Sequence, residues 1–172
     1  MTGNVRVMIS EEEVEKRIRE MAAEIDEKYA GKTVHLIGIL KGSVFFMTEL
    51  AKRITLPVTM DFISVSSYGN STHSSGVIKF NKDLDDEIEG KEVIIVEDIL
   101  DTGRTLSYVV KIMKERNPAS LSVITLLDKP DRRVVSVDLD MTGFVIPDEF
   151  VVGYGLDYAQ MYRNLPYIGI ME

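Results

Sequence analysis

The 172-residue sequence contains no cysteine, so neither disulfide bonds nor a thiolate nucleophile is available to it. Histidine is almost as scarce, because His35 and His73 are the only two, too few for a histidine-rich metal site. No apolar run approaches the roughly 20 residues of a membrane-spanning helix, and no signal-like segment opens the chain. We therefore expect a cytoplasmic protein with no membrane partner.

Positive charge is also in deficit. The chain has 20 lysines and arginines against 28 aspartates and glutamates, a formal net charge of -8 and a pI of about 4.9. This balance disfavours a broad nucleic-acid-binding surface, although it leaves room for a local basic patch. Hydrophobic residues make up 45% of the chain, and its length fits one domain over residues 1–172.

Residues 93–106 combine the features that carry chemistry. The apolar run 93–96 predicts a strand that is buried on both faces of a parallel sheet. Three carboxylates follow it: Glu97, Asp98 and Asp101. A short polar turn comes next, formed by Thr102, Gly103, Arg104 and Thr105. Apolar residues then recur at helical spacing from Leu106 to Met113, so the order is strand, acidic patch, turn and helix.

This arrangement suits a phosphorylated sugar. The turn offers backbone N–H groups and side-chain donors at a helix N-terminus, where a phosphate binds well. Paired carboxylates repel phosphate, but they accept hydrogen bonds from vicinal hydroxyls or hold a divalent metal. A ribose 5-phosphate satisfies both halves. The alternative is an ordinary strand–helix junction with a solvated acidic rim, but three acids beside this turn exceed what solubility needs.

Hydrophobic periodicity predicts the remaining elements. Ser10 and Glu13 form the pattern of a capping box, at the start of an amphipathic helix that ends before Gly31. A second helix is expected from Phe45 to Arg53. Strands are expected at 34–40, 58–65, 77–80, 121–127, 134–137 and 144–146.

Residues 97–105, Glu-Asp-Ile-Leu-Asp-Thr-Gly-Arg-Thr, resemble the phosphoribosyl pyrophosphate (PRPP) binding motif of the type I phosphoribosyltransferases. Separate stretches along the chain resemble further motifs of the hypoxanthine-guanine branch of this family. The resemblance implies an α/β fold with a central, mostly parallel sheet flanked by helices. It also implies a small hood formed by the chain ends and a flexible lid loop.

At the PRPP end, the resemblance assigns Asp101 as the catalytic residue and the turn 102–105 as the 5-phosphate site. Glu97 and Asp98 would hold the ribose diol, directly or through a metal. Lys41 and Gly42, from a Leu-Lys-Gly-Ser stretch, would bind pyrophosphate together with Arg163. A Lys-Gly-Ser turn between strand and helix is by itself only a weak anion-site signal. The Leu–Lys peptide is cis in many family members, so by resemblance we expect a strained Leu40–Lys41 bond, and the sequence leaves open whether that bond is cis.

At the base end, the resemblance places Lys129 at the purine 6-oxygen, Phe150 on the ring face and Val151 at the base edge, within a hood over about residues 129–172. Asp157, together with Glu97 and Asp98, would bind Mg²⁺. Lys129 also follows an apolar strand, and open α/β sheets bind ligands at that edge. A fixed N–H donor there favours a 6-oxopurine over adenine.

Residues 66–76 are small and polar, which predicts an exposed loop. The Ser-Ser-Tyr-Gly sequence at its start resembles the family's lid. Ser67 and Tyr68 would then close over PRPP and exclude water. A plain surface hairpin is the alternative, and Tyr68 is the residue that such a loop would not need.

The resemblance implies transfer of the phosphoribosyl group of PRPP to N9 of hypoxanthine or guanine, giving IMP or GMP and pyrophosphate in purine salvage. One alternative is the same reaction on another base, such as xanthine, adenine or a pyrimidine. Another is a nucleotide-sensing regulator that binds nucleic acid, which the acidic composition and the full catalytic set disfavour. The family implies a homodimer or homotetramer, for which the helix after Lys41 is a candidate interface.

Overall fold

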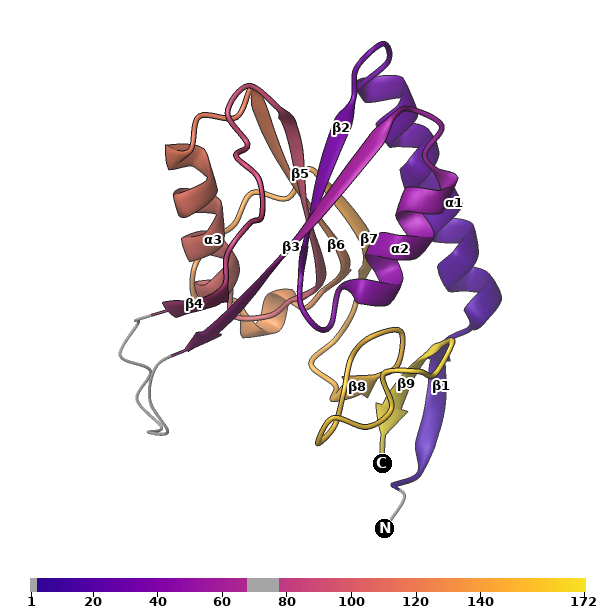
Figure 1. Cartoon of the computed structure of the whole chain (residues 1–172). Coiled ribbons are helices and arrows are strands. Elements are labelled where there is room, and N and C mark those ends of the chain that lie inside the picture. The colour runs from indigo at the N-terminus through magenta and orange to yellow at the C-terminus, as the bar shows by residue number, and fades with distance from the viewer. Residues whose placement is uncertain (1–2, 68–77) are drawn as a thin grey trace.

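The computed structural model describes residues 3–67 and 78–172, and its main body is a six-stranded sheet with helices on both faces (Figure 1). The strand order is β4-β3-β2-β5-β6-β7. Strand β4 is antiparallel to β3, and the other neighbouring pairs are parallel. This confirms the mostly parallel sheet. The strands are β2 (Val34–Ile39), β3 (Val58–Ser67), β4 (Ile78–Lys82), β5 (Glu92–Leu100), β6 (Ser120–Asp128) and β7 (Met141–Val145).

Helices α1 (Glu11–Lys28) and α2 (Val44–Arg53) cover one face of this sheet, and α3 (Arg104–Glu115) covers the other (Figure 1). A short 3-10 helix, η1 (Pro130–Arg132), follows β6. The predicted capping box opens α1, because Ser10 N–H donates to Glu13 Oε2 at 2.8 Å and Glu13 N–H donates to Ser10 Oγ at 3.2 Å. No helix in the described ranges is long and apolar enough to cross a membrane.

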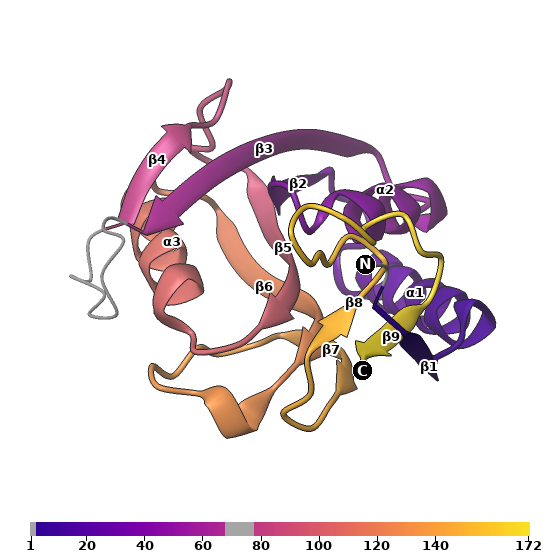
Figure 2. The same cartoon turned by 90° about the horizontal axis from the view of Figure 1, so that it is seen from below.

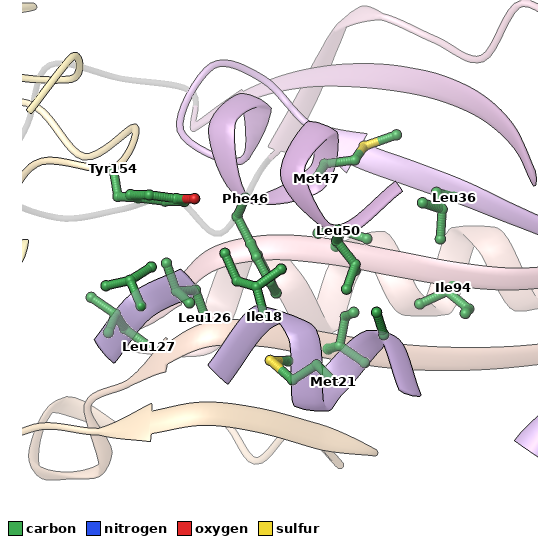
Figure 3. Close-up of a cluster of buried hydrophobic side chains, with 14 of the residues drawn as sticks. Ile18, Met21, Leu36, Phe46, Met47, Leu50, Ile94, Leu126, Leu127 and Tyr154 are labelled. Atoms are coloured by element: carbon green, nitrogen blue, oxygen red, sulfur yellow. The ribbon is translucent and has the colours of Figure 1, made fainter. Parts of the chain in front are cut away.

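The core on the α1/α2 side holds the layers together (Figure 3). Ile18 and Met21 of α1 and Phe46 of α2 are fully buried and face the sheet residues Leu36 and Ile94. Burying a side chain of this size contributes about 1.5–3 kcal/mol, so these contacts fix the helices firmly on the strands. The strand ends, and the loops that follow them, are thereby held at fixed positions.

A second, smaller sheet forms the hood. Its antiparallel strands are β1 (Val5–Ile9), β9 (Ile168–Met171) and β8 (Val151–Val152), in the order β1-β9-β8. The two chain ends therefore lie together, beyond the carboxyl ends of the main strands (Figures 1 and 2). Tyr154 extends from the hood toward Phe46 in the α1/α2-side core (Figure 3). The predicted hood of chain ends is confirmed.

Two predicted elements differ from the structure. The strand expected to stop at Val96 continues to Leu100, because the backbone around the acids still pairs with β6. The apolar segment 134–137 is not a strand, so that prediction was wrong. The N–H groups of Val134 and Val135 instead donate to Thr102 O, at 2.8 and 2.9 Å. These bonds support the turn after β5 and are unavailable to a sheet.

Candidate active site

Glu97 and Asp98 lie side by side near the end of β5, and both are partly buried. Burial raises the pKa of Glu97 well above its usual value, and the neighbouring Asp98 carboxylate raises it further. Burial also raises the pKa of Asp98, although hydrogen bonds from Glu97 and from the Ile99 N–H oppose this shift. The pair therefore retains a proton more readily than free carboxyls do, and it can both donate to and accept from a ligand hydroxyl.

The turn between β5 and α3 is held by its surroundings. Gly103 precedes α3 with φ of +86°, and a side chain there would clash with the backbone O of Val135. Arg133 Nε donates to Asp101 O at 3.1 Å, next to the bonds that Val134 and Val135 make to Thr102. The first backbone N–H groups of α3 are not used within the helix. This turn can therefore bind an anion on a fixed support.

Asp101 extends from the same turn. Its carboxylate is 42% exposed, and Arg132 Nε donates to Asp101 Oδ1 at 3.3 Å. An exposed ion pair of this length is weak, so it leaves Asp101 free to exchange partners. The position suits proton transfer to a ligand that lies above the turn.

The Lys41–Gly42 loop lies beside the acid pair. The Leu40–Lys41 peptide bond is cis, which settles the question that the sequence left open. A side chain on Gly42 would clash with the Asp98 carboxylate, so loop and acid are in direct contact. The structure thus brings together two stretches that the sequence separates by more than 50 residues, at the carboxyl edge of β2 and β5.

The hood packs onto this same loop. Gly155 has φ of +98°, and a side chain there would clash with the backbone O of Gly42. Arg163 Nη1 donates to Gly155 O at 2.7 Å, and its Nη2 lies 3.4 Å from Asp157 Oδ1. Arg163 and Asp157 are therefore held next to the Lys41–Gly42 loop, where the guanidinium can meet an anionic ligand and the carboxylate can meet a metal ion that accompanies it.

The base-binding candidates surround the hood end of the site. Lys129 is 8% exposed, and its Nζ lies 3.9 Å from Asp148 Oδ1. Phe150 is 53% exposed, and Tyr158 packs edge-on against it at 5.7 Å between ring centroids. Val151 is buried in β8. A largely exposed ring that is already held on one side provides a surface for stacking.

The lid prediction lies mostly outside the described residues. Residues 68–77, including Tyr68 and His73, are not described, and neither is the side chain of Ser67 at the end of β3. The roles of Ser67 and Tyr68 therefore stay predictions.

Within residues 3–67 and 78–172, no three His, Asp or Glu side chains are grouped closely enough to hold a metal unaided. Glu97, Asp98 and Asp157 thus do not make one protein-only site. Mg²⁺ is usually bound by one or two carboxylates, with phosphate oxygens and water completing its shell. The donors present fit an ion of this kind that arrives with a phosphorylated ligand.

Sequence reasoning missed two polar residues of this region. Arg132 pairs with Asp101, and Gln160 accepts hydrogen bonds from Lys41 and Arg163. The adjacent arginines 132 and 133, close after Lys129 in an acidic chain, were an available signal for the first. Nothing in the sequence distinguishes Gln160 from a surface glutamine.

Comparison with known proteins gives a consistent result. The family model described as "Phosphoribosyl transferase domain" matches residues 8–159. The hypoxanthine-guanine phosphoribosyltransferase of Bacillus subtilis is 51% identical over 97% of this chain and 93% of its own length. A bifunctional TilS/HprT protein of Listeria innocua is 54% identical over 97% of this chain. This chain spans only 26% of that protein's length.

Solved structures agree with the sequence relatives. A hypoxanthine-guanine phosphoribosyltransferase of Bacillus anthracis superposes with a TM-score of 0.94 at 45% identity, covering 98% of this chain and all of that one. The hypoxanthine phosphoribosyltransferase of Trypanosoma cruzi, solved with its product IMP, gives a TM-score of 0.92 at 40% identity, covering 99% and 95%. The α/β fold and the match to the family model define the class, a phosphoribosyltransferase. The chain belongs to the phosphoribosyltransferase family, among its hypoxanthine-guanine members.

Proposed function

We propose that this protein transfers the 5-phosphoribosyl group from PRPP to N9 of a 6-oxopurine, hypoxanthine or guanine. The products are IMP or GMP and pyrophosphate, and the setting is purine salvage. One observation carries the proposal: the Lys41–Gly42 loop contacts Asp98, beside the turn that begins α3. Two anion sites thereby flank an acid pair, in the order in which PRPP carries its pyrophosphate, its diol and its 5-phosphate.

Each part of PRPP then has a partner. The 5-phosphate binds Thr102, Gly103, Arg104 and Thr105, and the ribose diol binds Glu97 and Asp98. Pyrophosphate binds Lys41, Gly42 and Arg163. Groups anchored away from the reacting carbon let binding energy orient the sugar for attack. The support that residues 133–135 give to the turn is consistent with this anchoring role.

In the reaction, the bond from C1 of the ribose to the pyrophosphate oxygen breaks as the bond from C1 to N9 forms. We expect cleavage to lead, so positive charge develops on the ribose and negative charge on the leaving pyrophosphate. Lys41 and Arg163 stabilise the leaving group. Asp101 accepts or shares a proton at N7 of the attacking base and returns it in the reverse direction. Asp157, Glu97 or Asp98 would hold Mg²⁺, which would supply positive charge to the leaving pyrophosphate.

Selection of the base rests on Lys129, Phe150 and Val151. The Lys129 ammonium donates a hydrogen bond to the 6-oxygen. Adenine has an amino group at that position, which is also a donor and therefore does not accept this bond. Phe150 stacks on the purine, for which its exposed ring is suited, and Val151 offers backbone groups to the base edge. The T. cruzi relative solved with IMP supports a 6-oxopurine nucleotide as the product.

Further parts of the proposal come from the sequence. We infer a single catalytic domain over residues 1–172, with the lid at about 66–76. We also infer a homodimer or homotetramer, for which Phe45 of α2, 40% exposed, offers contact area. Action without a nucleic-acid partner, in the cytoplasm, stays a prediction from the acidic composition and the metabolic role.

A spectrophotometric assay with hypoxanthine, PRPP and MgCl₂ tests the proposal. We expect formation of IMP that requires all three components, and formation of GMP when guanine replaces hypoxanthine. A panel that adds xanthine and adenine measures kcat/KM for each base. Turnover of adenine in preference to hypoxanthine would contradict the role of Lys129, and absence of turnover with every base would contradict the function itself.

A further inference from the structure

A single oxygen atom connects the two cations of the pyrophosphate end. Gln160 Oε1 accepts a hydrogen bond from Lys41 Nζ at 3.2 Å and another from Arg163 Nη2 at 3.1 Å. Lys41 belongs to the loop after β2, whereas Gln160 and Arg163 belong to the hood loop after β8. The glutamine side chain therefore links the main sheet to the hood at the place where both cations converge.

The backbone of Gln160 takes part in the same arrangement. Gln160 has φ of +68°, a left-handed conformation that is uncommon for residues other than glycine. In this conformation its N–H donates to Asp157 Oδ2 at 2.9 Å. Arg163 Nη2 lies 3.4 Å from the other oxygen of the same carboxylate, Asp157 Oδ1. One residue thus contacts both cations and the candidate magnesium ligand.

We propose that Gln160 is a positioning residue for the pyrophosphate site, a role that rests on the function proposed above. Lys41 and Arg163 have long side chains, and ordering such side chains costs conformational entropy when a ligand binds. Their positive charges also repel each other. An acceptor between them orders both side chains in advance and offsets the repulsion, so pyrophosphate meets donors that already converge.

The chemistry of the amide suits this role. A neutral carbonyl oxygen satisfies both cations but leaves their net charge available to an anion. Gln160 is itself exposed, so it can give way as phosphate oxygens approach. The role makes a selective prediction, because the affinity for pyrophosphate and PRPP depends on Gln160 while the affinity for the base does not.

Calorimetric titration of inorganic pyrophosphate with MgCl₂ into the full-length protein tests this inference without turnover. Gln160→Leu removes the acceptor. Leucine is not branched at Cβ, so it avoids the extra strain that a β-branched residue has in the left-handed conformation. We expect its Kd for pyrophosphate to rise about tenfold, the loss equivalent to one charge-assisted hydrogen bond. Its KM for PRPP rises in parallel, and its KM for hypoxanthine stays within about twofold.

Two further variants test the charge and the reach of the acceptor. Gln160→Glu keeps an oxygen acceptor at the same reach but adds a negative charge that neutralises the two cations, so we expect its Kd to rise at least as much as that of Gln160→Leu, and this rise to shrink at high salt. Gln160→Asn keeps an amide and suits the left-handed conformation, but it is one methylene shorter and should weaken binding as Leu does. Asn164→Leu is the matched control, an amide-to-apolar change at an exposed residue next to Arg163, and it should bind normally.

The outcomes distinguish the two proposals. If the unchanged protein does not bind pyrophosphate, the proposed function fails, and the role of Gln160 fails with it. If the unchanged protein binds pyrophosphate and Gln160→Leu binds it equally well, only the role of Gln160 is overturned. A loss in Asn164→Leu as large as that in Gln160→Leu would also overturn it, since the effect would then be a general disturbance of the hood loop.

Discussion

The two anion sites that we propose for this protein are supported in different ways. The turn 102–105 is supported by backbone, because Val134 and Val135 donate to Thr102 O and α3 starts directly after Gly103. The Lys41–Gly42 loop has a backbone bond of its own, from Val44 N–H to Lys41 O at 3.1 Å, and the hood contacts it in addition through Gly155 and the side chain of Gln160. Backbone bonds hold a fixed position, whereas side chains rearrange. The difference fits a substrate that is anchored firmly by its 5-phosphate and releases its pyrophosphate.

The largest effect is expected at Asp101. It tests whether proton transfer can be removed while PRPP still binds at the turn 102–105. Asp101→Asn removes the proton acceptor but leaves the bonds to Thr102 O in place. We expect kcat to fall by roughly 10² or more with little change in PRPP affinity. Steady-state kinetics with PRPP titration measures both quantities. An unchanged kcat would remove Asp101 from the chemistry.

The next effect tests whether the hood supports the Lys41–Gly42 loop. Gly155→Ala introduces a side chain against Gly42 O at φ of +98°. Gly90→Ala is the matched control, since Gly90 has φ of +72° with nothing within 4 Å, and it bears only the left-handed strain of about 1–2 kcal/mol. We expect Gly155→Ala to weaken pyrophosphate binding about tenfold or more relative to this control. Equal calorimetric Kd values for both variants would show that the hood contact is not needed.

A stability effect is expected at the acid pair between the two anion sites. The folded-state pKa of Glu97 is raised, so the folded chain holds more protons than the unfolded chain and stability falls as pH rises. This destabilisation is complete above the folded-state pKa and absent below the unfolded one. Glu97→Gln should therefore raise the melting temperature of the ligand-free protein at pH 8, by about 2–4 °C for each kcal/mol relieved.

The control for Glu97→Gln is the pH dependence of its gain in melting temperature. Calorimetric melting at pH 5 should show a smaller gain than at pH 8, because part of the Glu97 population is then already neutral. A gain that is constant with pH would mean that the charge of Glu97 is not its cause. Binding of PRPP should weaken more at pH 8 than at pH 5, since more of the Glu97 population is a charged acceptor for the diol at the higher pH.

The smallest effect concerns the exposed pair of Arg132 and Asp101. Such pairs contribute about 0.2–1 kcal/mol, so Arg132→Ala should change kcat by less than about fivefold. The change should shrink further when the assay is repeated at high salt, which screens exposed charges. A large fall that is independent of salt would instead place Arg132 at the reacting centre.

The sequence alone predicted those features that are determined by residues close together in the chain. The capping box of Ser10 and Glu13, the run of acids after a buried strand and the glycine turn all act through neighbouring residues. The end of β5 was placed too early, because pairing with β6 overrides the polarity of Glu97. The segment 134–137 was misread since its partner, Thr102, lies far away in sequence. Gln160 was missed for the same reason, because its partner Lys41 comes from a distant loop.

The position of β9 has a consequence for how the protein is made. Strand β9 lies between β1 and β8, so the hood joins β1, which precedes the strands of the main sheet in the sequence, to β9, which follows them. Every strand of the main sheet is synthesised before β9, and domains begin to fold as they emerge. A nascent chain can therefore hold Glu97 and Asp98 in place before the hood has formed. Catalytic competence then arises only when β9 pairs with β1 and β8.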